Sequence, residues 1–300
     1  IILCVKTEHN GDLYMITLVS LIIRGLMLGA LYALTGFGLS VAFGIMRVIN
    51  VAHGDFAILA AFLSLVCMEF LKIDPLISFV MVGPVLFAVG FLSQKFLINR
   101  VLPRGLNYPV LITFAISIVI ENLLLLVFTP DAQSLTPAYL LKGIELDGII
   151  LSPSYTLSFL LALITFITIH YFLKKTYLGK AMRAVPIDSE AAKMVGIKPE
   201  AIYNLAMGIA MLTTALAGIL LGMTFTFYPY TGPKYLIMAF GVVVIGGLGS
   251  LKGTFIGGLI MGVSLILGGY FFGAHYQLMV CYLIIIIVLL LRPQGLFGRK

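Results

Sequence analysis

The sequence predicts an all-α integral membrane protein, a polytopic helix bundle of eight to ten transmembrane segments, and three observations predict this fold class. Apolar residues make up 61% of the 300 residues, and Asp, Glu, Lys and Arg together make up only 10%, against about 25% in soluble proteins. The mean hydropathy is +1.13. Apolar runs of about 20 residues, the length that crosses a bilayer, recur along the chain. A soluble core could not bury so much apolar surface, so we expect a single transmembrane domain over residues 1–300.

Seven apolar runs are the right length for single spans. They cover residues 54–71, 76–98, 109–128, 155–173, 201–222, 255–273 and 278–292. Residues 13–50 exceed one span, so we predict two segments there, the second irregular or interrupted by glycine. The glycines in that stretch are Gly25, Gly29, Gly36, Gly38 and Gly44. Residues 235–251 form a further Gly-rich apolar stretch, and full crossing by the Gly-rich stretches would bring the total to ten.

Basic residues between the apolar runs predict the orientation. The 174–200 loop carries six Lys or Arg, the 99–108 turn carries Arg100 and Arg104, and the C-terminus carries Arg292, Arg299 and Lys300. Basic loops face the cytoplasm, so these regions are expected inside. The 129–154 loop has three acidic residues against Lys142, and the 67–75 turn is also acidic, so both are expected outside. Ten crossings would place the N-terminus inside.

Small residues four positions apart mark faces where helices can approach closely. Such spacing relates Gly25 to Gly29, Gly218 to Gly222, Gly258 to Gly262, and Gly249 to Gly253 and Gly257. The pattern fits tight packing within one subunit, and it also fits a subunit interface.

Several function classes have no support in the sequence. The net charge is +7, but the basic residues lie between apolar runs and not on one stripe, so no nucleic-acid partner is expected. Cys4, Cys67 and Cys281 are far apart and form no disulfide or metal motif. The sequence has no P-loop and no dinucleotide fingerprint. We therefore expect no catalytic site, no cofactor and no metal, and the chain is not expected to be an enzyme.

Polar residues inside the apolar runs are the candidates for a translocation path. Thr113, Ser117 and Glu121 recur at intervals of four and share one face of the 109–128 helix, with Asn122 beside Glu121. A carboxylate within a membrane span is costly and is often functional. Glu121 therefore has two interpretations, a substrate or gating contact in a water-filled path, or a buried glutamate bonded to a neighbouring helix.

Residues 50–55 form a polar break, Asn50-Val51-Ala52-His53-Gly54-Asp55, between two apolar segments. A cytoplasmic turn with Asp55 near the N-cap of the next helix would explain it, because a short acidic side chain satisfies free N–H groups there. Asn50 and His53 remain candidates for the path.

The 174–200 loop contains a predicted short helix. Asp188 or Ser189 can cap its start, Gly196 can end it, and Pro199 suits the first turn of the next span. Such a helix has little to pack against in its own chain, so it is either a docking knob for a soluble partner or a solvated turn.

Glu190-Ala191-Ala192, followed after three residues by Gly196, resembles the EAA loop of ABC-importer permeases. In that family the loop forms a helix that sits on the ATPase subunit. The family's further Ile-x-Leu-Pro element is absent after Gly196. The resemblance implies an ATPase-coupling loop that contains Arg183, Asp188, Glu190, Ala191, Ala192 and Gly196.

A more extensive resemblance runs from about residue 21 to residue 298. The chain looks like the branched-chain amino-acid permeases, and most like the LivH-type subunit. The motifs that carry it are 28–34 (LGALYAL), 44–55 (GIMRVINVAHGD), Arg183-Ala184, Gly196-Ile197, Ala217-Gly218, 246–250 (GGLGS) with Gly253, and 292–298 (RPQGLFG). In that family's pattern an amide is common where Glu121 stands here.

This resemblance implies an ABC-importer permease fold in a cytoplasmic (inner) membrane. It implies a second permease subunit, two ATP-binding-cassette ATPase subunits and an external substrate-binding protein. The expected cargo is a branched-chain or related hydrophobic amino acid. The same machinery for urea or short amides is an alternative, and a stand-alone ion-coupled transporter or channel that uses Glu121 is an alternative of another class.

Overall fold

The computed structural model describes residues 10–105, 107–140, 143–146 and 149–298. Cys4, Lys142, Arg299 and Lys300 lie outside the described residues.

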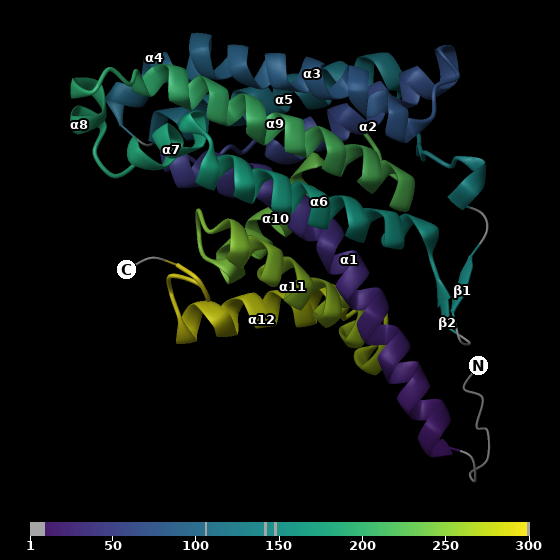
Figure 1. The fold of residues 1–300 in the computed structure, drawn as a ribbon. Helices are drawn as coiled ribbons and strands as arrows, with labels where there is room; N and C mark the ends of the chain where they lie inside the picture. Colours follow the sequence, from purple (N-terminus) through teal and green to yellow (C-terminus); the bar gives the residue numbers. More distant parts are fainter. Residues whose placement is uncertain (1–9, 106, 141–142, 147–148, 299–300) are drawn as a thin grey trace.

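The described chain is built from long apolar helices (Figure 1). Seven are long and apolar enough to cross a membrane, the third continuing through its short extensions to Arg104, and two shorter apolar helices accompany them. The seven are α1 (Asn10–Met46), α2 (His53–Phe70), α3 (Pro75–Ser93), α5 (Asn107–Phe128), α6 (Pro153–Lys175), α9 (Pro199–Thr224) and α11 (Leu251–Phe272), and the shorter two are α10 (Gly232–Gly246) and α12 (Gln277–Leu291). The polytopic helical fold is confirmed. Of the nine apolar helices in the described residues, seven are long enough to span, against the eight to ten segments predicted.

Short elements extend or join these helices. A π-helix η1 (Gln94–Ile98), a turn α4 (Asn99–Val101) and a 3₁₀ turn η2 (Leu102–Arg104) continue α3. The 174–200 loop holds α7 (Tyr177–Ala184) and α8 (Ser189–Met194), and the 129–154 loop holds η3 (Ala138–Leu140) and a hairpin of β1 (Ile144–Leu146) and β2 (Ile149–Leu151).

The prediction of two segments in residues 13–50 is wrong. The structure has one continuous 37-residue helix, α1, that ends at Met46. Its glycines do not interrupt it, because they serve close contact with neighbouring helices. A Cβ atom on Gly29 would overlap the backbone of Gly258 in α11, and one on Gly262 would overlap the backbone of Gly25 and Gly29.

The spaced glycines pack within the subunit. Gly218 lies against the backbone of Ala57, and Gly257 lies against Val242 and Gly246. Backbone contact of this kind lets helices gain dispersion energy that lipid cannot provide. Of the two interpretations of the glycine spacing, packing within one subunit is confirmed at these positions.

Helix α2 is the central element. It is buried along most of its length and packs against α9, α10, α3 and α5. Helix α1 runs obliquely through the molecule against α11, α9, α6 and α10 (Figure 1). The main buried cluster therefore joins α1, α2 and α9.

The two ends of the bundle differ in what they carry. Figure 1 shows α7 and α8 at one end with the segment after α12, and β1 and β2 at the other end with the first turns of α1. One crossing by α1 therefore puts the start of this helix on the side of the acidic 129–154 loop. This differs from the inside position that ten crossings would give.

Candidate functional site

The chain between α1 and α2 turns back into the bundle. Val48, Asn50 and Ala52 are buried, and His53 Nε2 lies 2.8 Å from the carbonyl oxygen of Thr35. Thr35 precedes the end of α1 by eleven residues, which at 1.5 Å per residue is about 16 Å along the helix. Helix α2 thus begins deep inside the bundle.

This placement corrects the expectation of a cytoplasmic turn at residues 50–55. The segment is buried, and Asp55 does not cap the helix. Asn50 Oδ1 accepts a hydrogen bond from the backbone N–H of Ala52 at 3.1 Å, and the position before His53 has no side-chain cap. The reason is that non-helical backbone at membrane depth must be satisfied by protein groups, and several polar side chains gather here to do so.

Thr113 and Ser117 are two of these side chains. Both are buried on the face of α5 that packs on α2. The backbone N–H of Val51 donates to Thr113 Oγ1 at 3.2 Å, and Ser117 donates to Asp55 Oδ2 at 2.5 Å. The predicted shared face of α5 is therefore present, and it binds the broken segment.

Asn50 and His53 complete the polar cluster around this segment. The Asn50 amide contacts Met207 Sδ at 3.7 Å, and the Thr214 hydroxyl lies 3.5 Å from the His53 ring nitrogens. Because a carbonyl only accepts, the contact with Thr35 places a proton on His53 Nε2. In the isolated chain Asn50 and His53 bind other helices of the same subunit.

Asp55 lies where two helices begin. Its side chain is 1% exposed, and its Oδ1 has no hydrogen-bond partner within the described residues. A Cβ on Gly232, the first residue of α10, would overlap this Oδ1, and a Cβ on Gly54 would overlap the Gly232 carbonyl. The N-termini of α2 and α10 therefore meet beside one carboxylate, where both helix dipoles favour negative charge.

Glu121 and Asn122 lie one turn beyond Ser117. Glu121 is partly buried, and its carboxylate is close enough to Asp55 to interact with it electrostatically. Asn122 is exposed and donates to the Ile118 carbonyl of its own helix at 2.8 Å. The structure thus places one carboxylate inside the α2–α5 contact and a second one at its edge.

The 174–200 loop forms the predicted short helix, α8. Asp188 Oδ1 accepts hydrogen bonds from the backbone N–H groups of Glu190 and Ala191 at 3.0 and 2.9 Å, so Asp188 is the cap. Gly196 has φ +84° just after the helix, which is the conformation expected of a C-terminal glycine. Pro199 opens α9 as predicted.

Helix α8 and the residues that flank it present apolar side chains to the outside. Ile187, Met194 and Val195 are 78%, 84% and 72% exposed, while Ala192 is buried against the rest of the chain. Arg183, Glu190 and Ala191 are exposed as well. This arrangement is typical of a surface that binds another protein.

In the 129–154 loop, which is predicted to lie outside the membrane, η3 is tied to the start of α3. Tyr139 donates its hydroxyl to Asp74 Oδ1 at 3.1 Å, and Asp74 also caps α3 through Leu76 N–H. Burial and the adjacent carboxylate of Asp74 raise the pKa of Tyr139, so the phenol stays a hydrogen-bond donor at neutral pH.

The glycine-rich motif after α10 packs against the motif after α12. The backbone N–H groups of Leu296 and Phe297 donate to the carbonyls of Ile245 and Gly246, both at 2.9 Å. Gly249 lies against Gly44 at the end of α1. Three motifs that are far apart in sequence thus meet at the α7–α8 end of the bundle.

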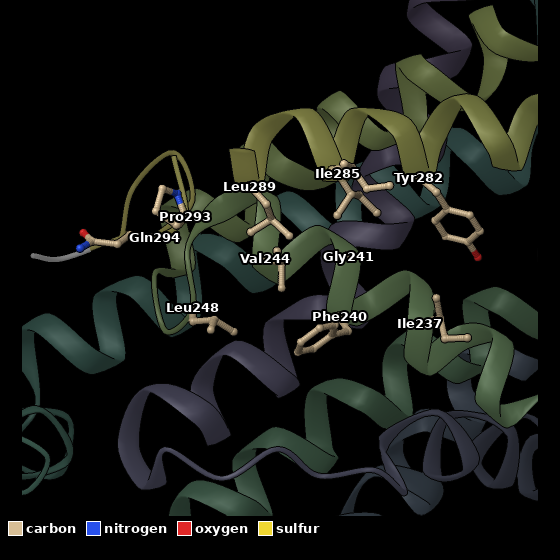
Figure 2. Close-up of a pocket in the computed structure, with 11 residues that line it drawn as sticks. Ile237, Phe240, Gly241, Val244, Leu248, Tyr282, Ile285, Leu289, Pro293 and Gln294 are labelled. Carbon is tan, nitrogen blue, oxygen red and sulfur yellow. The ribbon is translucent and has the colours of Figure 1, made fainter. Parts of the chain in front are cut away.

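A groove of about 440 Å³ lies between α10 and α12. Figure 2 shows Ile285 and Leu289 of α12 facing Val244 and Phe240 of α10 across it. No charged side chain lines this groove, so it offers nothing to pair with the charges of an amino acid.

Sequence reasoning missed part of the polar cluster. Asp55 was assigned a capping role, and Thr214 and Gly232 were not singled out. An amide chain was also missed, in which Gln94 donates to Asn99 and Asn99 donates to Asn204, each at 2.8 Å. The spacing of Asn99 and Asn204 gives no signal, because they are 105 residues apart in sequence.

Long apolar helices, a broken segment at membrane depth and a protruding loop helix define a multi-pass transport protein. Among the described residues, no group of three His, Cys, Asp or Glu side chains could hold a metal ion. A family model described as "Branched-chain amino acid transport system / permease component" matches residues 21–289. The chain belongs to this family, so it is a multi-pass permease component of a branched-chain amino acid transport system in the cell membrane and not an enzyme.

BraD and LivH match this chain over nearly their whole lengths, and LivM matches it over two thirds of its length. The chain is 29% identical to the high-affinity branched-chain amino acid transport system permease protein BraD of Pseudomonas aeruginosa, over 93% of this chain and 95% of that protein. It is 28% identical to LivH of Escherichia coli K12 over 92% and 94%, and 24% identical to LivM of Salmonella typhimurium over 89% and 67%. No solved structure matches the chain.

Proposed function

We propose that this chain is one of two permease subunits of an ATP-driven importer of branched-chain or related hydrophobic amino acids. A second permease completes the path, two ATP-binding-cassette ATPases dock on the cytoplasmic side, and an external binding protein delivers the cargo. The full-length similarity to BraD and LivH supports the cargo, because both are named for branched-chain amino acid transport. Similarity to LivM supports a partner of related fold.

The observation that carries ATP coupling is helix α8. It is capped by Asp188, ended by Gly196 and surrounded by exposed Ile187, Met194 and Val195. A six-residue helix with exposed apolar flanks has no stabilising contact of its own on that face, so a soluble partner is the natural cover. An ion-coupled carrier has no need of such a surface.

The translocation path is proposed to run along the contact of α2 and α5. Glu121 and Asn122 lie at its accessible edge, and Thr113, Ser117, Asn50 and His53 form the polar wall behind it. In this proposal Glu121 meets the cargo, and the buried residues hold the broken segment in place.

Two substitutions test coupling. Glu190→Arg reverses a charge on the docking face, and Gly196→Pro is incompatible with the positive φ and removes the hydrogen bond from Gly196 N–H to Lys193. Both are expected to abolish uptake of radiolabelled leucine by cells while the chain remains in the membrane. Glu69→Arg, an exposed charge reversal at the opposite end, is the matched control. Normal uptake in both loop variants would remove the ATP-coupled proposal.

The partners and the alternatives are tested by purification of the tagged chain from its native membrane. Recovery with a second polytopic permease and P-loop ATPases supports the importer, and ligand titration of the binding protein separates branched-chain amino acids from urea or short amides. Recovery alone, with uptake that survives ATP depletion and is lost in Glu121→Gln, would instead support an ion-coupled carrier. The proximity of the Glu121 and Asp55 carboxylates is the observation that keeps this alternative.

A further inference from the structure

We infer that the crevice between α3 and α5 binds an anionic phospholipid of the cytoplasmic leaflet, with an acyl chain in the crevice and the headgroup at Lys95, Arg100 and Arg104. The crevice has a volume of about 690 Å³, within the roughly 300–1,000 Å³ range of ligand pockets. It is lined by Leu92, Phe96 and neighbouring residues of α3 and η1, by Ala115, Ile116 and Val119 of α5, and by Phe56 and Leu59 of α2.

The packing of α5 explains why this space exists. Helix α5 contacts mainly α2, and it reaches the extended α3 mostly at η1 and η2. Ala115 contributes only a methyl group to the wall of the crevice. Helix α5 therefore leaves the α3 and η1 residues that line the crevice, Val89 to Leu97, uncovered. The lining is almost wholly apolar, with Ser93 as its one polar side chain, which suits a hydrocarbon chain and not a zwitterion.

Three cations lie toward one end of this crevice. Lys95 Nζ lies 5.3 Å from the centroid of the Phe96 ring, and that ring lines the crevice. Arg100 and Arg104 follow in α4 and η2, which continue the helix from η1. All three are exposed. No Asp or Glu occurs between residues 75 and 120, so this strip of the chain supplies no opposing charge.

The position of the three cations in the bundle indicates that the anion they bind is a lipid headgroup. Figure 1 shows α4 at the same end of the bundle as α7 and α8, which is the end predicted to face the cytoplasm. Exposed Tyr108 lies at the same level, at the start of α5, as aromatic residues do at membrane interfaces. Anionic lipids of the cytoplasmic leaflet attract such basic clusters, so the crevice and the cations together fit a lipid that has both parts.

The test measures lipid enrichment around the purified chain. The protein is reconstituted in nanodiscs of phosphatidylcholine with a minor fraction of phosphatidylglycerol, released into detergent, and analysed for bound lipid by native mass spectrometry. We expect bound phosphatidylglycerol in excess of its bulk fraction. Two variants should reduce it to the bulk fraction, Ala115→Phe, which fills the crevice, and the triple variant Lys95→Gln/Arg100→Gln/Arg104→Gln. Each cation near the membrane surface contributes roughly five-fold to affinity.

Matched controls separate the site from general effects. Ile118→Phe adds a ring on an exposed position of α5 that does not line the crevice, and Lys174→Gln/Lys175→Gln/Lys180→Gln removes three cations elsewhere at the same end. Both controls should keep the enrichment. Equal retention of phosphatidylcholine, or enrichment that survives Ala115→Phe, would overturn the lipid site.

A second permease could cover the same crevice, and this outcome has its own readout. In the assembled complex, Ala115→Cys would then cross-link to the second permease, and the bound phosphatidylglycerol would be absent. That result would overturn the lipid site while it leaves the importer proposal intact. Retained phosphatidylglycerol in the complex, without a cross-link, supports the inference.

Discussion

At the scale of single residues, Asp55 joins three elements of the bundle. Its Oδ2 accepts from Ser117 of α5, and its Oδ1 lies against Gly232 at the start of α10. A buried carboxylate is tolerated only where other groups compensate its lost hydration. Here the compensation comes from one hydroxyl and from the positive ends of two helices.

Replacement of Ser117 by alanine should destabilise the chain. Asp55 would lose its hydroxyl donor while it stays buried, and an unsatisfied buried polar group costs about 1–3 kcal/mol, more for a charged one. The thermal unfolding temperature in one detergent is the measurement. Ser158→Ala is the control, because the Ser158 hydroxyl is equally buried but bonds only the Ser154 carbonyl of its own helix. An unchanged unfolding temperature in Ser117→Ala would contradict this role of Asp55.

Replacement of Gly232 by alanine should be at least as damaging. The added Cβ would overlap Asp55 Oδ1 and the α2 backbone, and overpacking of this kind costs roughly 1–3 kcal/mol. Gly269→Ala is the matched control, since its Cβ would lie 3.4 Å from the nearest atom, which belongs to the flexible Gln277 side chain. We expect a lower yield of folded Gly232→Ala by size-exclusion chromatography, and equal yields of both variants would argue against the close contact.

At the scale of elements, the C-terminal end of α3 depends on a change of helix type. The π-helix η1 redirects α3 so that Gln94 and Asn99 face α9, where Asn204 completes a chain of amide hydrogen bonds. Such π-turns often occur at functional positions. Since α9 begins directly after the 174–200 loop, this amide chain links α3 to the helix that follows the proposed coupling loop.

Asn99→Ala should loosen this link. It removes two side-chain hydrogen bonds at once and leaves the buried Gln94 and Asn204 amides without them, at about 1–3 kcal/mol for each group left unsatisfied. Limited proteolysis of the 99–108 turn should accelerate. Asn107→Ala, an exposed asparagine in the same turn, should leave the cleavage rate unchanged. Equal rates in both variants would show that the amide chain does not hold α3 against α9.

The small hairpin in the 129–154 loop was not predicted, although the sequence carries a signal for it. Asp147-Gly148 stands between Ile144–Leu146 and Ile149–Leu151, and Asp-Gly between apolar runs favours a two-residue hairpin. The hydropathy pattern dominated the interpretation of this region. Local turn chemistry would have found the hairpin.

At the scale of the whole molecule, the single long helix α1 decides the topology. With α1 crossing once, the first turn of this helix lies at the β1–β2 end and the loop with α8 lies at the other end (Figure 1). The basic 174–200 loop predicts that the second end faces the cytoplasm. The start of α1 should therefore face outward.

Cysteine labelling in intact cells tests this topology. In a chain whose three native cysteines are replaced, a membrane-impermeant maleimide should label Asn10→Cys and Asp131→Cys without permeabilisation. Lys193→Cys should be labelled only after the membrane is opened. If Asn10→Cys, like Lys193→Cys, is labelled only after the membrane is opened, the chain crosses the membrane an even number of times between these two residues. In that case α1 does not span as one helix.

The sequence alone determined the fold class, most spans and the short capped helix α8, and its loop charges predict the orientation. These follow from local rules, because span length, loop charge and cap chemistry each depend on residues that are neighbours in the chain. The residue spacing also placed Thr113, Ser117 and Glu121 on one face of α5.

Only the tertiary structure decided how these parts meet. It showed α1 to be continuous, buried Val48, Asn50 and Ala52 inside the bundle and brought Asp55 to Ser117 and Gly232. The physical reason is that these contacts join residues 62 to 177 positions apart. A glycine that permits helix contact has the same sequence signal as a glycine that breaks a helix, and only the neighbour it meets distinguishes the two.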